Sequence, residues 1–194
     1  MFEELEYKYR ADNISLNDFK ALMNSSHVLK QIVAASWDIY YSNASNSNSF
    51  VRLRLGEKPE LTIKVKTTDG NNWRRIEIDL PLDPARLTED TVSKFVAEFG
   101  YKENFRIFKA CDIHVLEYTN FVYYVVYDTN LQEVGRFAEV EVNKEKVMEL
   151  DSLAPGQAMA KLREGEMVLE KLGISAQNRL KKSLFEIFKK EVAK

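Results

Sequence analysis

Five short segments of this 194-residue chain alternate strictly between apolar and polar residues, and the polar member is almost always charged. The segments span residues 4–10, 51–55, 61–66, 75–80 and 138–142. Side chains of a β-strand point to opposite faces with a period of two, so each segment predicts a strand with one apolar and one charged face. The fold must therefore cover five apolar faces and give five charged faces a common environment.

Two environments fit these charged faces. In the first, one face of an open sheet packs on helices and the other faces water. Solvent faces usually mix in Thr, Ser, Gln and Asn, however, whereas these carry Glu, Asp, Arg and Lys almost exclusively. In the second, a closed barrel turns the charged faces inward and helices cover its apolar outside. A lumen lined in this way could separate its charges into a basic half for phosphates and an acidic half for a divalent metal.

Particular residues give this lumen a candidate chemistry. The pairs Glu4/Glu6 and Glu139/Glu141 are spaced i, i+2 on their strands, which places the side chains about 6–7 Å apart. Two such pairs facing one another could supply oxygen ligands to Mg²⁺ or Mn²⁺. Arg52 and Arg54 share one face, and the guanidinium fork matches phosphate oxygens.

The rest of the chain completes an α+β pattern. Further strands are expected over residues 39–42, 106–117 and 121–128, which gives a sheet of about eight strands with mainly antiparallel neighbours. Capped or amphipathic helices are expected over residues 15–25, 88–99, 145–153, 158–172 and 176–192. The polar run 42–49 (SNASNSNS) predicts a flexible loop, with a plain hairpin tip as the alternative.

Composition narrows the class of protein. The net charge is −2 with 30% charged residues, so a generally basic nucleic-acid binder is disfavoured. No apolar run approaches the roughly 20 residues of a spanning helix, and Cys111 is the single cysteine. We expect one domain over residues 1–194 in the reducing cytoplasm, without membrane or nucleic-acid partners and without a signal peptide. The sequence leaves open whether it is a monomer or a homodimer.

The ordered set of motifs resembles the CYTH superfamily, also called triphosphate tunnel metalloenzymes. Its hallmark is an N-terminal Glu-x-Glu-x-Lys strand, which here reads Glu4-Leu5-Glu6-Tyr7-Lys8. The resemblance continues through segments 40–41, 51–54, 61–64, 75–77, 128, 135–141 and 182–183, and so covers nearly the whole chain. It implies an eight-stranded antiparallel closed β-barrel, or tunnel, with helices packed outside and a helical C-terminus.

The resemblance also implies roles for individual residues. The metal-side carboxylates, which would hold Mg²⁺ or Mn²⁺, would be Glu4, Glu6, Glu139 and Glu141. Contacts to the phosphate chain would come from Lys8, Arg52, Arg54, Lys64, Arg75 and Lys109, and from Lys182 at the tunnel mouth. Two further residues, Glu77 and Asp128, would line the tunnel. Lys8 and the four carboxylates would form the catalytic set.

Three positions depart from the superfamily's pattern. Cys111 replaces an arginine, Ser42 replaces an acid and Leu184 replaces a tyrosine. The resemblance implies a metal-dependent triphosphatase that acts on inorganic triphosphate, a nucleoside triphosphate or thiamine triphosphate. A class IV-type adenylyl cyclase, which makes cyclic AMP and pyrophosphate, is the alternative enzyme. A catalytically weak module that binds a nucleotide or polyphosphate is the alternative outside enzymes.

Overall fold

The computed structural model describes residues 2–66, 74–86 and 88–192, which contain eight antiparallel strands arranged as one sheet. In chain order the strands are β1 (Phe2–Arg10), β2 (Lys30–Asn43), β3 (Asn46–Gly56), β4 (Glu60–Lys66), β5 (Arg74–Pro81), β6 (Lys102–Val115), β7 (Thr119–Tyr127) and β8 (Glu133–Val142). Their hydrogen-bonded order is β1-β5-β4-β3-β2-β6-β7-β8, and β1 pairs with both β5 and β8. The pairings therefore follow a ring, whose shortest seam joins β1 to β5 over four residue pairs.

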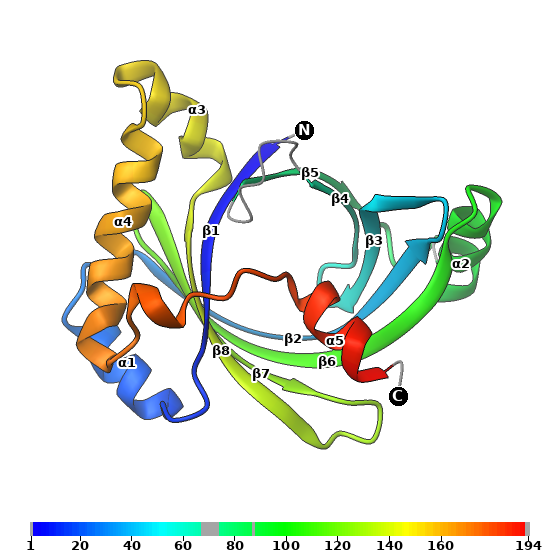
Figure 1. Cartoon of the computed structure of the whole chain (residues 1–194), viewed down its shortest axis with the longest axis horizontal. Coiled ribbons are helices and arrows are strands. Elements are labelled where there is room, and N and C mark those ends of the chain that lie inside the picture. Colours follow the sequence, from blue (N-terminus) through cyan, green and yellow to red (C-terminus); the bar gives the residue numbers. More distant parts are fainter. Residues whose placement is uncertain (1, 67–73, 87, 193–194) are drawn as a thin grey trace.

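The described residues form five α-helices, of which four pack on the outside of the sheet and α5 lies against the cavity that the sheet encloses. They are α1 (Leu16–Asn24), α2 (Glu89–Glu98), α3 (Lys144–Leu153), α4 (Gln157–Leu169) and α5 (Leu184–Val192). Figure 1 shows α1, α3 and α4 together on one side and α2 on the opposite side. Ser15 begins α1 with a reciprocal capping box to Asp18, and Thr88 caps α2 through the backbone N–H of Thr91. The expected α+β class with eight antiparallel strands is confirmed.

The apolar faces of the strands point outward and pack under these helices. On the side of α1, α3 and α4, buried residues such as Tyr7, Val140 and Leu162 form one core. Beneath α2, Leu53 packs in a second core with residues of the helix. Because these faces are removed from water, the charged faces of the same strands must point to the inside of the ring. The charged faces therefore do not form the solvent-facing side of an open sheet.

The expected loop at residues 42–49 is wrong in its extent. β2 continues to Asn43 and β3 begins at Asn46, so only two residues form the turn between them. The Asn43 side chain accepts a hydrogen bond from the Ser45 backbone N–H, and the Asn46 side chain accepts one from the Asn48 backbone N–H. Side-chain bonds of this kind stabilise turns, while strand pairing uses backbone groups that every residue possesses. The alternative, a hairpin tip, is the one observed.

The expected C-terminal helix over residues 176–192 is also wrong in its first half. A short 3₁₀ turn, Ala176–Asn178, is followed by an extended segment, and α5 begins only at Leu184. Arg179 forms a β-bridge with Tyr9, and the Leu180 N–H donates to the Lys8 carbonyl at 2.7 Å. β1 pairs with β5 only from Phe2 to Leu5, so the same edge of its second half can bind the backbone of this segment. These backbone groups pair with β1 instead of continuing a helix. In Figure 1 this segment crosses from α4 past β1 to α5.

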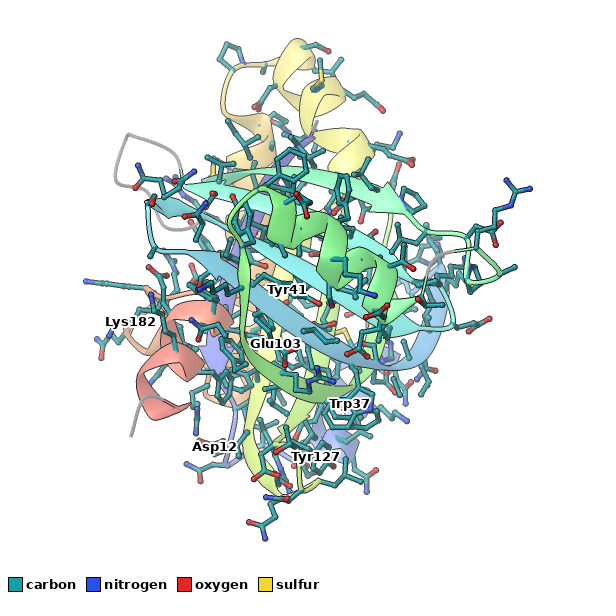
Figure 2. All side chains as sticks on the ribbon, turned by 90° about the vertical axis from the view of Figure 1, so that its right-hand side faces the viewer. Asp12, Trp37, Tyr41, Glu103, Tyr127 and Lys182 are labelled. Atoms are coloured by element: carbon teal, nitrogen blue, oxygen red, sulfur yellow. The ribbon has the colours of Figure 1, made fainter. Side chains whose placement is uncertain are left out.

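β2 is much longer than the segment 39–42 expected from sequence. It pairs with β6 from Lys30 to Ser42 and with β3 only from Ser36 onward. Figure 2 shows α2 packed across the outside of this part of the sheet. No helix in the described ranges has the length and apolar character needed to cross a lipid bilayer.

Candidate active site

The inward faces of the strands enclose a cavity of about 260 Å³. Its lining within the described part of the chain contains six acidic and six basic side chains. The acids are Glu4, Glu6, Glu60, Glu77, Glu139 and Glu141, and the bases are Lys8, Arg52, Arg54, Lys64, Lys109 and Lys144. Charged side chains are rarely buried unless they are paired, so a lining this dense in charge indicates a site built to bind charged groups.

Three carboxylates gather at one side of the cavity. Each of Glu4, Glu6 and Glu141 offers an oxygen, and these atoms lie within 4.8 Å of one another. Strand pairing explains the arrangement, because Glu6 of β1 is directly opposite Glu141 of β8. Glu4 Oε1 accepts a hydrogen bond from Lys64 at 2.7 Å, whereas its buried Oε2 has no partner among the described residues.

The electrostatics of this group favour a bound cation. Burial, and then the nearby carboxylates, raise the pKa of Glu141 to about 7 against a hydrogen bond from Asn120. Burial and Glu6 likewise raise the pKa of Glu4 in spite of Lys64. Raised carboxyl pKa values mean that the ionised group lacks enough positive charge around it. An unpartnered oxygen within a cluster of hard oxygen donors fits Mg²⁺ or Mn²⁺.

Glu139 lies beside this group but outside it. Its Oε1 accepts a 2.5 Å hydrogen bond from the Tyr124 hydroxyl and is 2.9 Å from Lys8 Nζ. Burial, followed by Glu139 itself, holds the pKa of Tyr124 well above its usual value, so the phenol remains a donor. Lys8 Nζ also contacts Glu6 at 2.9 Å. Lys8 therefore joins the three-carboxylate group to Glu139.

Glu77 is surrounded by cations instead of carboxylates. It lies 2.9 Å from Lys64 Nζ and 3.9 Å from Arg52, and it forms a third ion pair with Lys144. Burial alone would raise the pKa of Glu77, but Lys64, Arg52 and Lys144 together lower it to about 2. Glu77 is therefore ionised and serves as a fixed counter-ion. Lys144, the first residue of α3, was not identified from sequence because it lies outside any alternating strand.

Asp38 is a second fixed counter-ion, and sequence reasoning missed it as well. Its carboxylate is fully buried and accepts hydrogen bonds from Arg54 Nε at 2.8 Å and Nη2 at 3.0 Å. Lys109 Nζ lies 4.0 Å away. The signal was present, since Ser36, Asp38 and Tyr40 share one strand parity. This parity can be recognised only when the strand is known to begin before residue 39.

Four of the basic residues expected to bind phosphate line the cavity, in addition to Lys8. Arg52, Arg54, Lys64 and Lys109 all line it, and Lys109 Nζ also lies 4.1 Å from the centre of the Tyr124 ring. Cys111, which replaces an arginine, lines the same cavity, and burial raises the pKa of its thiol. Arg75 belongs to β5 and pairs with Glu4, but its side chain lies outside the described residues.

Two expected site residues do not reach the cavity. Asp128 follows the end of β7, is absent from the cavity lining, and stabilises a turn by accepting hydrogen bonds from the backbone N–H groups of Asn130 and Gln132. Lys182 is exposed and is absent from the cavity lining, and Figure 2 shows it at the margin of the molecule beside α5. The neighbouring Ser183, Leu184 and Phe185 contribute to the lining in its place.

No protein-family model matches the chain, and no curated protein matches it by sequence.

Solved structures share the fold. The PH1012 protein of Pyrococcus horikoshii matches with a TM-score of 0.70 at 20% identity, covering 94% of this chain and 98% of that one. A candidate adenylate cyclase from Vibrio parahaemolyticus has a TM-score of 0.64 at 15% identity, covering 97% and 98%. Another, from Bacillus halodurans, has a TM-score of 0.59 at 15% identity, covering 97% and 99%. At these identities the likeness establishes a common fold.

Proposed function

Because the chain has the fold of the triphosphate tunnel superfamily, we propose that it is a metal-dependent triphosphatase whose ring of strands forms a tunnel for the substrate. One observation carries the proposal. A three-carboxylate group and a set of buried arginines and lysines face the same cavity of about 260 Å³. A triphosphate with its divalent cation has the same division of charge.

The acidic side would hold the metal. Glu4, Glu6 and Glu141 are the proposed ligands for Mg²⁺ or Mn²⁺, since their oxygens lie within 4.8 Å of one another. A divalent cation bound there would neutralise phosphate charge and polarise the phosphoryl group. Glu139 is proposed to hold Lys8 at the border of the acidic and basic sides, through the 2.9 Å ion pair between them.

The basic side would bind and orient the phosphate chain. Arg52, Lys64 and Lys109 are nearly buried, so hydrogen bonds from them to phosphate oxygens are formed largely away from water and are correspondingly strong. Asp38 and Glu77 hold these cations in place before the substrate arrives. Donors fixed in advance need little reorganisation when charge develops on the transferred phosphoryl group. Water would attack the terminal phosphorus and the bond from that phosphorus to the bridging oxygen would break, which gives inorganic phosphate and a diphosphate.

The identity of the products tests the proposal. We expect the protein to release phosphate from inorganic triphosphate or ATP in the presence of Mg²⁺ or Mn²⁺, and to lose this activity with a chelator. Cyclic AMP and pyrophosphate from ATP would instead indicate a cyclase. Saturable binding without turnover would indicate a binding module. Either result would overturn the triphosphatase.

Matched variants test the metal ligands. Glu141→Gln and Glu6→Gln keep the shape of the side chain but remove its charge, and we expect each to lower the metal-dependent rate at least 100-fold. Asp128→Asn makes the same chemical change in the β7–β8 turn and should retain the wild-type rate. Wild-type rates in both glutamate variants would exclude these carboxylates as metal ligands.

A further inference from the structure

A second cavity, of about 520 Å³, lies next to the charged one. We call it the mouth pocket. Its lining includes the hydroxyl and amide residues Ser42, Asn43, Asn46, Ser49 and Asn104, together with the ring of Phe185. Lys102, Glu103 and Lys189 add charges at its edge. The neutral hydrogen-bonding groups distinguish this pocket from the charged cavity.

Phe185 lies between the two cavities, because it lines both of them. Its ring stacks on Phe50 of β3, with the ring centres 4.7 Å apart and the planes 12° apart. Along β3, Phe50 is followed two residues later by Arg52 on the same inward face, while across the sheet Ser42 pairs with Phe50. The mouth pocket therefore begins one inward position beyond the proposed phosphate-binding residues.

The polar groups of the mouth pocket are held in place by the protein. Asn104 Nδ2 donates to Ser42 Oγ at 2.9 Å, and Ser49 Oγ lies 2.8 Å from the Tyr101 hydroxyl. Asn43 Nδ2 donates to the Phe99 carbonyl at 3.0 Å. Fixed amides and hydroxyls around one aromatic face are the usual means of orienting an uncharged, flat, hydrogen-bonding group. Inorganic triphosphate has no such group and would leave this pocket unused.

We infer that the mouth pocket binds the nucleoside part of a nucleoside triphosphate, whose phosphate chain extends past Phe185 into the charged cavity. This inference rests on the proposed function, since it requires phosphates to bind beside Arg52. It selects organic over inorganic triphosphates as the substrate class. The polar lining makes hydrogen bonds to the base and sugar, and the Phe185 ring, which is held by stacking on Phe50 and Phe105, adds an apolar contact.

Two analogues that resist hydrolysis test this selection by binding alone. They are adenosine (β,γ-imido)triphosphate, which carries a nucleoside, and inorganic diimidotriphosphate, which does not. We expect calorimetry with Mg²⁺ to give at least fivefold tighter binding of the adenosine analogue to the wild-type protein. Equal or weaker binding of that analogue, alongside measurable binding of the inorganic one, would overturn the inference while the proposed function stands. Absence of binding for both would overturn both.

Variants of the lining locate the effect. Ser42→Phe should fill the mouth pocket and Asn104→Ala should remove an amide from it. Each is expected to weaken the adenosine analogue at least fivefold and to leave the inorganic analogue within twofold of wild type. Asn130→Ala, in the exposed β7–β8 turn, is the control and should change neither constant. If circular dichroism shows that one of the two variants is unfolded, the other variant decides the test. An equal loss of affinity for the adenosine analogue and the inorganic analogue would contradict the inference.

Discussion

Asp38 organises the basic side of the cavity although it does not line the cavity itself. Burial alone would raise the pKa of this carboxyl, but the Arg54 guanidinium, with help from Arg52 and Lys109, holds the pKa well below its usual range. Asp38 is therefore ionised in the folded protein. Arg54 donates two hydrogen bonds of fixed direction to this carboxylate, which limits the orientations that its guanidinium can adopt.

Replacing Asp38 should reveal this role as a loss of stability. We expect Asp38→Asn to lower the free energy of unfolding at pH 7 by about 2–3 kcal/mol, because Arg54 loses its buried counter-ion. The Arg54 side chain is 31% exposed, so water compensates part of the loss. Urea denaturation measures the change. Asp90→Asn breaks an exposed pair with Lys94 and should leave stability nearly unchanged. Equal stability of wild type and Asp38→Asn would contradict this role.

The same variant gives a pH signature. A carboxyl with a depressed folded-state pKa stabilises the protein above its unfolded-state pKa of about 3.9, and that contribution is lost as the pH falls toward the folded-state value. The difference between wild type and Asp38→Asn should therefore stay constant from about pH 7 to pH 5 and shrink below about pH 4. A difference that grows on acidification would contradict the assignment.

Sequence predicts residues of this site well where strand parity is clear. Glu4, Glu6 and Arg52 were identified because short alternating segments reveal which side chains share a face. Arg10 shows the limit, because it has the right parity but lies at the exposed end of β1, where Cζ is 5.0 Å from the centre of the Phe137 ring and Nε is 2.7 Å from Asp12. Strand parity gives the face of a residue but not its depth along the strand.

At the level of elements, α4 lies so close to the sheet that one helix position has no room for a side chain. A Cβ added at Gly165 would overlap Val140 Cγ2 of β8. Helix propensity favours alanine over glycine by about 1 kcal/mol, but overpacking costs about 1–3 kcal/mol. We therefore expect Gly165→Ala to lower the melting temperature measured by calorimetry. A rise in melting temperature would show that α4 can move away from the sheet.

Arg179 anchors the segment before α5 to α4 and β1. Its guanidinium makes hydrogen bonds of 2.6 Å to both carboxylate oxygens of Glu166 on α4, and it lies 3.5 Å from the centre of the Tyr7 ring. Glu166 also accepts a hydrogen bond from the Tyr9 hydroxyl. These contacts connect α4, β1 and the C-terminal segment that carries Phe185 to the cavity.

Removing the Arg179 side chain should increase local opening of α5 without unfolding the sheet. We expect Arg179→Ala to speed amide hydrogen exchange in Leu184–Val192 at least tenfold, because the segment before α5 loses its side-chain anchor. Exchange in β4, whose buried Leu61 belongs to a different core from that of α5, should stay within twofold of wild type. Unchanged exchange in α5 would mean that the aromatic contacts of Phe185 and Phe188 suffice to hold it.

The elements differ in how far local sequence determines them. The strands with alternating charge and the capped helices were predicted because their signals lie within the segments. The start of β2 was missed because Ile32, Val33, Ala34 and Ala35 show no alternation. The break before α5 was missed because its cause, the free edge of β1, is more than 160 residues away in the chain.

At the scale of the whole molecule, the eight strands bring opposite charges into balance. Six acidic and six basic described side chains line one cavity, and most of them form internal ion pairs. The strand order places opposite charges side by side. It pairs β1 with β8, where Lys8 is opposite Glu139, and β4 with β5, where Lys64 is opposite Glu77. The neutral balance lets the charges remain buried before a ligand binds.

The strand order is the part of the fold that sequence patterns could not determine. Alternation predicts strands and their faces, but β1 pairs with β5 and β8, which lie roughly 70 and 130 residues further along the chain. The resemblance to the tunnel superfamily predicted eight antiparallel strands in a tunnel, but not their order. Local patterns alone left the solvent-facing sheet as a valid alternative.

The location of a bound metal tests the central claim most directly. Crystals grown with Mn²⁺ and inorganic diimidotriphosphate allow manganese to be located by its anomalous scattering. We predict manganese at the oxygens of Glu4, Glu6 and Glu141, with phosphate groups against Arg52 and Lys64. Manganese at another site, or phosphate density outside the charged cavity, would contradict the account.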